Sequence, residues 1–261
     1  MSNERQQRAA RAEQMRKERE KADRKQRNMI TVAIVVVVVT LIAVGGFAVK
    51  KASDDNASST AYVAPANLSS AANFAFDYTA TDAGGAAPTT DPVKVVLYED
   101  FQCPVCKAFE AADGAFLDNA VKTGQITIEY RPYAFLDRSS STRYATRAMN
   151  AAMCVLDEGG AAVYKKMHDI LYANQPEEGT AGLPDSDLID FAKQAGATGT
   201  DSCINTEKFS PWVKKAKSKV ESDGVTGTPT VRIGGKDVNN SAGGAPTVAD
   251  LQAAITAAAK A

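Results

Sequence analysis

Four cysteines are the residues of this 261-residue sequence best suited to chemistry. Cys103 and Cys106 enclose a Pro-Val dipeptide, and the other two are Cys154 and Cys203. Cysteines three positions apart can form a local disulfide, which leaves Cys154 and Cys203 to pair with each other. The spacing predicts one reactive dithiol and one structural disulfide, with a second redox centre at Cys154 and Cys203 as the alternative.

The residues around Cys103 predict that it stands at the start of a helix. The apolar run 93–98 is typical of a buried strand, and a helical pattern follows Cys106. Pro104 suits the first turn of such a helix. Unpaired backbone N–H groups and the helix dipole would then favour the Cys103 thiolate, making it a nucleophile and a good leaving group. Cys106, one turn farther along, is expected to be buried and to resolve mixed disulfides.

Two other interpretations of the Cys103–Cys106 pair are an inert disulfide and half of a zinc site. A zinc ribbon needs two closely spaced cysteine pairs, whereas Cys154 and Cys203 are 49 positions apart. The single histidine, His168, lies in a helical pattern and is predicted to be a surface or packing residue. We therefore predict no metal ligands.

The amino-terminal part of the chain predicts a membrane anchor. Residues 1–28 hold ten basic and five acidic side chains, and residues 29–49 form 21 positions without a charge. Such a run can span a bilayer as a helix, and the basic arm should stay in the cytoplasm. The rest of the chain, with a net charge of −6, would lie outside the cytoplasm. The interleaved acids argue against a nucleic-acid partner.

A cleaved signal peptide is the alternative to this anchor. Signal peptides have shorter apolar cores and a small-residue cleavage site, and neither feature is present here. Residues 50–90, rich in small and polar side chains, are expected to form a linker with a possible strand near Phe76.

The order of the remaining elements predicts an α/β fold. The strand at 93–98 and its helix are followed by a strand at 125–133, which implies a parallel pair. Helical patterns come next, and then a hairpin and a closing helix: 140–173 broken at Gly159–Gly160, 185–196, 210–222, a hairpin over 228–238 and a helix over 247–260. The helical block at about 139–222 interrupts the rest as an insertion.

A dithiol at a helix start, after a buried strand and with Thr228-Pro229 opening a later strand, resembles the thioredoxin fold. The helical insertion and the segment YEDFQCPVCKAFE resemble its DsbA-like branch, in particular the membrane-anchored proteins of Gram-positive bacteria. The resemblance covers about residues 90–260, so residues 91–261 are expected to form a thioredoxin-like domain.

This resemblance implies roles for several residues and partners. Pro229 would be a cis-proline facing the dithiol, and the backbone of Thr228 would bind substrate as an added strand. No cofactor is implied. The substrates would be unfolded secreted proteins with free thiols. A quinone-linked membrane protein of the DsbB or vitamin K epoxide reductase type would reoxidise Cys103 and Cys106.

Three positions depart from the family pattern. Val105 stands where many oxidases have histidine, and Leu97 where many relatives have a buried acid. Glu99 and Asp100 follow nearby and are expected in the loop before the helix. Thr228 also occurs before the cis-proline of isomerases.

The combined prediction is a single-pass membrane protein whose extracytoplasmic domain oxidises protein thiols. An isomerase or a reductase of the same fold is the alternative enzyme, because the fold does not set the direction of exchange. A peptide-binding chaperone module is the alternative without catalysis.

Overall fold

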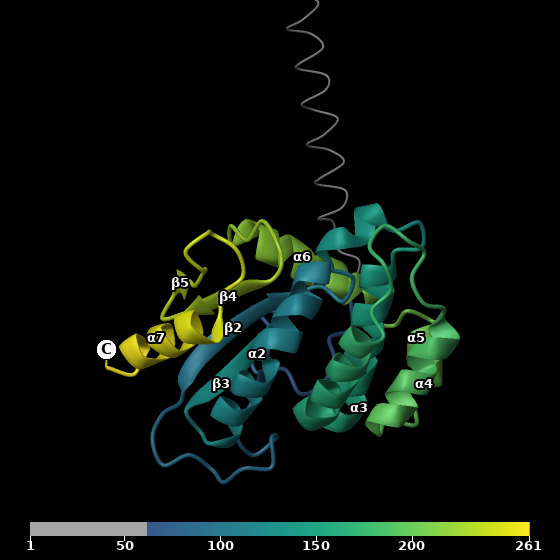
Figure 1. The fold of residues 1–261 in the computed structure, drawn as a ribbon. Helices are drawn as coiled ribbons and strands as arrows, with labels where there is room; N and C mark the ends of the chain where they lie inside the picture. The colour runs from purple at the N-terminus through teal and green to yellow at the C-terminus, as the bar shows by residue number, and fades with distance from the viewer. Residues whose placement is uncertain (1–61, 261) are drawn as a thin grey trace, which may run out of the picture. The chain divides into compact units, whose positions relative to one another are not determined.

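The computed structural model describes residues 62–260 (Figure 1). The predicted basic arm at 1–28 and the predicted anchor at 29–49 lie outside these residues. Among the helices of residues 62–260, none combines the length and apolar character needed to cross a membrane.

One mixed sheet of five strands organises these residues, in the order β1-β3-β2-β4-β5. The central strand β2 (Val93–Glu99) pairs in parallel with β3 (Ile126–Pro132) and antiparallel with β4 (Thr230–Ile233). β1 (Phe76–Tyr78) and β5 (Lys236–Asp237) form the antiparallel edges. The predicted parallel pair and carboxy-terminal hairpin are confirmed.

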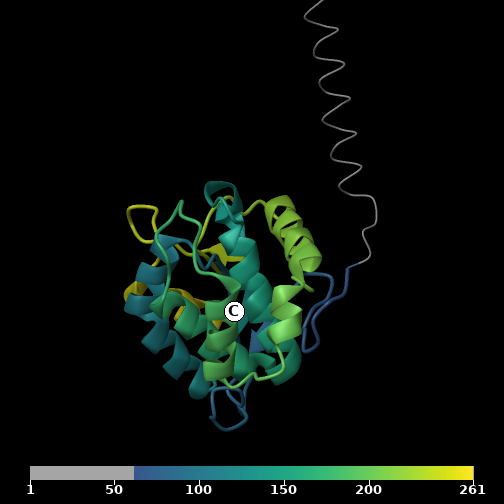
Figure 2. The ribbon, with the colours of Figure 1, turned by 90° about the vertical axis from the view of Figure 1, so that its right-hand side faces the viewer.

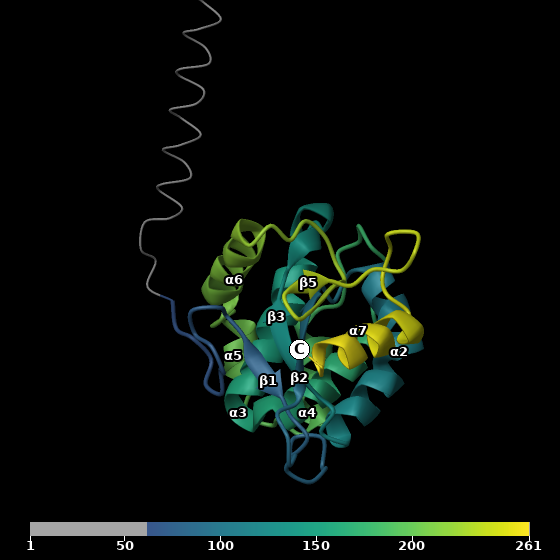
Figure 3. The ribbon, with the colours of Figure 1, turned by 90° about the vertical axis from the view of Figure 1, so that its left-hand side faces the viewer.

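Helices cover both faces of the sheet. Figure 3 shows α2 (Pro104–Lys122) and α7 (Val248–Ala258) on one side of the strands and α6 (Ser210–Ser222) on the other. α7 begins at the capping box predicted from sequence, in which Thr247 and Asp250 each accept the other's backbone N–H. These layers bury the centre of β2 and fix where its carboxyl end meets α2.

The helical insertion lies between β3 and β4 and is confirmed as a block of helices beside the sheet (Figures 1 and 2). Its long helix α3 contains the predicted break, because Gly160 has a φ of +74°, a conformation that glycine adopts without strain. The insertion consists of η1 (Phe135–Ser139), α3 (Tyr144–Ala173), α4 (Asp185–Ala195), α5 (Asp201–Asn205) and α6. Two short elements of the insertion, the 3₁₀ helix η1 and the five-residue helix α5, were not predicted from sequence.

Part of the segment expected to be a linker is instead bound to α3. The N–H of Ala66 donates to Asp157 Oδ1 at 2.7 Å, and Asn67 Nδ2 donates to the Leu156 carbonyl at 2.9 Å. Phe74 also packs on Trp212, with 5.3 Å between ring centroids. The linker prediction was wrong for these residues because small, polar composition does not exclude long-range docking.

Candidate active site

Cys103 is the N-cap residue of α2, and Pro104 occupies the first turn, where its missing N–H costs no hydrogen bond. The Cys103 thiol donates a hydrogen bond to the Thr228 carbonyl at 3.3 Å, and Gln175 Nε2 donates to the Cys103 carbonyl at 2.9 Å. The residue is 6 % exposed, whereas Cys106 is fully buried. Of the two sulfurs, only that of Cys103 has access to a reaction partner in solution.

Thr228 and Pro229 reach this helix start through the sheet. Pairing of β4 with β2 brings Thr228 beside Cys103, although the two residues are 125 positions apart. The Thr228–Pro229 peptide bond is cis. The Thr228 hydroxyl is buried without a partner among the described residues. It is therefore free to donate to a Cys103 thiolate.

The pKa values of the two cysteines are shifted in opposite directions. Hydrogen bonding from Cys106 lowers the pKa of Cys103 to about 6 against opposing burial, with help from Thr228 and two backbone N–H groups. Burial raises the pKa of Cys106 well above its usual value. The pair therefore combines a nucleophilic, easily expelled thiolate with an inner thiol that keeps its proton.

We expect alkylation of Cys103 by iodoacetamide to follow this acidity. Its rate should rise with pH around a midpoint near pH 6, where the thiolate forms. Since folding lowers this pKa from about 9 to about 6, the stability it contributes to the reduced protein is complete above pH 9. That contribution is lost as the pH falls through 6. Mass spectrometry of the reduced protein after timed alkylation gives the profile.

Cys106→Ala is the matched variant for this measurement. It removes the strongest hydrogen bond to the Cys103 sulfur, so the midpoint should move toward that of an ordinary thiol. A midpoint near pH 9 in the unmodified protein would contradict the assigned acidity.

Asp100 fixes the loop that carries Cys103. Its carboxylate accepts the N–H of Gln102 and the N–H of Leu136, each at 2.7 Å, and its carbonyl accepts the Tyr172 hydroxyl at 3.3 Å. Burial raises the pKa of Asp100 to about 7. The loop is thus tied to both η1 and α3, which holds the start of α2 in place.

The surface beside Cys103 carries two exposed apolar side chains from the dithiol motif, Pro104 and Val105. Val105 is 52 % exposed, whereas Phe101 and Phe109 are buried. Gln102 Nε2 donates to the Thr180 carbonyl at 3.3 Å, so the loop after α3 borders this surface. An extended peptide that reached Cys103 would contact Val105.

A buried ionic cluster that the sequence did not predict lies behind α2. Glu99 ends β2 and accepts a hydrogen bond from His168 Nε2 at 3.1 Å, and Glu110 of α2 lies beside them. His168 is completely buried, not on the surface. Burial opposes its charge, but Glu110, Asp169 and Glu99 outweigh burial and raise the pKa of His168 to about 10. Glu110 sits one helical turn after Cys106, which is the one local signal that pointed to this cluster.

Leu97, at the position of the family's buried acid, is 1 % exposed and lies in the apolar core. Burial and Cys103 raise the pKa of Cys106, and the charge of Glu99 raises it further. Although Leu97 replaces the family's buried acid, another buried acid, Glu99, still lies near the dithiol.

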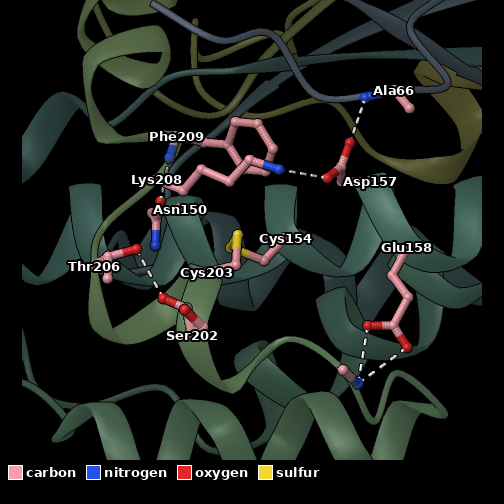
Figure 4. The surroundings of a disulfide bond; sticks show 11 residues. Ala66, Asn150, Cys154, Asp157, Glu158, Ser202, Cys203, Thr206, Lys208 and Phe209 are labelled. Atoms are coloured by element: carbon pink, nitrogen blue, oxygen red, sulfur yellow. Dashed lines mark hydrogen bonds and ion pairs between the residues drawn. A yellow bond between two sulfur atoms is a disulfide. The ribbon is translucent and has the colours of Figure 1, made fainter.

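Cys154 of α3 and Cys203 of α5 form a disulfide, with 6.0 Å between their Cα atoms (Figure 4). Both residues belong to the insertion. Nearby, Asp157 accepts from Lys208 Nζ at 2.9 Å as well as from Ala66, so the same turn of α3 holds two further segments. This disulfide joins elements remote from the first turn of α2.

Comparison with known proteins places these features in a family. The family model described as Thioredoxin matches residues 88–257. Among solved structures, DsbG of Mycobacterium tuberculosis, a disulfide bond oxidoreductase in its reduced form, is 32 % identical with a TM-score of 0.59, over 71 % of this chain and 87 % of that one. DsbA of the same organism is 31 % identical with a TM-score of 0.59, over 72 % and 93 %. The expected thioredoxin fold with a helical insertion is confirmed.

A curated relative shares only part of its length with this chain. The serine/threonine-protein kinase PknE of M. tuberculosis is 32 % identical over 125 residues, which are 46 % of this chain and 21 % of the kinase. The chain thus spans about a fifth of the length of this kinase, so the similarity concerns one region of it.

Proposed function

The chain belongs to the DsbA-like branch of the thioredoxin superfamily, the branch of thiol–disulfide oxidoreductases, and from this membership we propose that it donates disulfide bonds to secreted or surface proteins through Cys103 and Cys106. The proposal rests on two pKa shifts of opposite direction. The pKa of Cys103, at the start of α2, is lowered, and the pKa of the buried Cys106 is raised. Stabilising one thiolate favours the reduced enzyme, and a stable reduced form makes the disulfide a stronger oxidant.

The exchange proceeds in two displacements. A substrate thiolate attacks Cys103 in the oxidised enzyme, the Cys103–Cys106 bond breaks, and Cys106 leaves as a thiolate and takes up a proton. A second substrate thiolate then attacks the substrate sulfur of the mixed disulfide and expels the Cys103 thiolate. The substrate gains a disulfide, and its two electrons remain on the enzyme's dithiol. The low pKa of Cys103 favours the second displacement.

Substrate binding is assigned to the backbone of Thr228 and to Pro229. Both residues precede the short strand β4, and the Thr228 carbonyl lies 3.3 Å from the Cys103 sulfur. An extended segment of an unfolded protein would pair with this backbone and rest a side chain on Val105. Such contacts involve the main chain of the substrate, so the site would bind segments of many different sequences.

Turnover requires an external electron acceptor for the reduced dithiol. We assign this role to a quinone-linked membrane protein of the DsbB or vitamin K epoxide reductase type. The apolar run at 29–49 would anchor the enzyme in the same membrane with its catalytic domain outside the cytoplasm. A shared membrane would raise the frequency of encounters between the two proteins.

The reduction potential of the Cys103–Cys106 pair tests the proposed direction. We expect the full-length protein, equilibrated against glutathione, to give a value closer to about −120 mV than to about −270 mV, the potentials of a strong oxidant and of thioredoxin. The redox state is read by alkylation and mass spectrometry. The Cys154→Ser/Cys203→Ser variant is the control, since it leaves one titrating pair.

A potential at or below that of thioredoxin would overturn the oxidase and favour a reductase fed by a membrane donor. The chaperone alternative is tested separately with Cys103→Ser/Cys106→Ser. If that variant kept full activity in folding assays, peptide binding alone would explain the function.

A further inference from the structure

Three ionisable side chains from three different elements meet behind α2. Glu99 comes from the end of β2, Glu110 from α2 and His168 from α3. One carboxylate oxygen of each glutamate and one histidine nitrogen lie within 4.8 Å of one another. We propose that these residues bind a divalent transition-metal ion, for which zinc is the probe, independently of the disulfide chemistry.

The donor set suits such an ion. Two carboxylates and one imidazole supply three nitrogen and oxygen ligands, the number that open zinc sites take from the protein. Zinc bonds of about 2.0–2.2 Å place tetrahedral ligands about 3.4 Å apart. His168 Nε2 and Glu99 Oε2 are already 3.1 Å apart, and all three ligand atoms lie within 4.8 Å of one another, so the remaining adjustment falls on the Glu110 side chain.

His168 is already oriented as a metal ligand. Its Nδ1 lies 3.1 Å from Asp169 Oδ1, and Lys165 Nζ holds the same oxygen at 2.7 Å. Donation from Nδ1–H to Asp169 keeps Nε2 directed at Glu99, so that an ion which displaces the Nε2 proton meets a lone pair already aimed at the cluster. Metal-binding histidines in proteins are oriented by such a carboxylate on the other ring nitrogen.

The cluster also has an unsatisfied acceptor. Glu99 is 5 % exposed, and its Oε1 has no hydrogen-bond partner among the described residues. A buried oxygen without a partner is costly, and a bound cation satisfies it.

Gly114 makes room for the Glu110 carboxylate. A Cβ atom at this helical position would lie 3.0 Å from Glu110 Oε2. Glycine inside a helix costs about 0.5–1 kcal/mol relative to alanine. The absent side chain lets Glu110 fold along α2 next to the other two ligands.

A cavity gives an ion access to the cluster. It has a volume of about 370 Å³ between α2 and α3, and its lining includes Glu110, Gly114, Asp118, Lys165 and Asp169. Ligand and second-sphere residues thus border a space open to solvent, which provides the entry route that a metal site requires.

The test measures zinc binding by the full-length protein in its oxidised form, in which the Cys103–Cys106 disulfide removes both thiolates as ligands. Competition with a chromophoric chelator should show one zinc ion per chain. Cobalt substituted for zinc should give a spectrum without a thiolate charge-transfer band. Glu110→Gln should weaken zinc binding by about tenfold or more, since it removes a charged ligand.

Asp118→Asn is the matched control, because it removes a carboxylate from the same cavity without removing a ligand of the cluster. It should weaken zinc binding less than Glu110→Gln does, because all three ligands remain in place. Gly114→Ala is a second variant, which brings a methyl group against the Glu110 carboxylate and should also weaken zinc binding, with circular dichroism as the check that the variant is folded.

Failure of the oxidised protein to bind stoichiometric zinc would overturn the proposal and leave a metal-free ion cluster. Equal weakening by Glu110→Gln and Asp118→Asn would do the same, because it would reduce the effect to general electrostatic attraction. Neither result bears on the exchange chemistry of Cys103 and Cys106.

Discussion

Cys103→Ser is expected to lower the rate of disulfide transfer to a dithiol peptide by about 10³-fold or more, to the rate without enzyme. A serine oxygen cannot form the mixed disulfide, and fully buried Cys106 cannot replace it because its sulfur does not reach solvent. Its raised pKa also keeps it protonated. The measurement is the oxidation of a fluorescent dithiol peptide by the pre-oxidised enzyme.

Cys106→Ser gives the contrasting result. This variant keeps the Cys103 nucleophile but lacks the sulfur that resolves a mixed disulfide. After treatment with an oxidised peptide, it should accumulate a covalent enzyme–peptide adduct at Cys103, visible by non-reducing mass spectrometry. An adduct at Cys106 in Cys103→Ser, or full transfer by that variant, would reverse the assignment of the two roles.

Removal of the Cys154–Cys203 disulfide should have the largest effect on stability. The bond closes a loop of 49 residues, and loss of that constraint on the unfolded chain is worth about 4 kcal/mol in the chain-entropy account. For a domain of this size, Cys154→Ser/Cys203→Ser should lower Tm by about 8–16 °C. Differential scanning calorimetry of the two proteins measures the shift.

An assay of disulfide transfer distinguishes a structural role of Cys154 and Cys203 from a role as a second redox centre. Below its Tm, Cys154→Ser/Cys203→Ser should oxidise the dithiol peptide at the wild-type rate, because the disulfide joins α3 to α5 and does not contact the start of α2. Loss of transfer in a variant that remains folded would show that Cys154 and Cys203 exchange electrons with the substrate or with Cys103.

Local patterns predicted most of the architecture. The apolar run at β2, Pro104 at the start of α2 and the Thr247 capping box each determine an element through neighbouring residues. The short helix α5 was missed because five residues carry too little periodicity to be recognised. For the insertion, the sequence predicted helices but not how these helices pack.

Contacts between residues far apart in the sequence could not be predicted from local patterns. The docking of Ala66 on Asp157 joins positions 91 apart, and the Glu99–His168 contact joins positions 69 apart. No spacing rule connects such pairs, so His168 was expected to be a surface or packing residue. The cluster required the sheet and the insertion to be placed against each other.

The strand order of the sheet has a consequence for the biogenesis of the enzyme. β2 can pair with its parallel neighbour β3 soon after both are synthesised, but its other neighbour, β4, follows only after the whole helical insertion and brings Thr228 with it. Until Thr228 emerges, all four cysteines are present without a completed pocket. The nascent protein thus passes through an interval in which its own thiols compete for wrong partners, and the synthesis of β4 closes that interval.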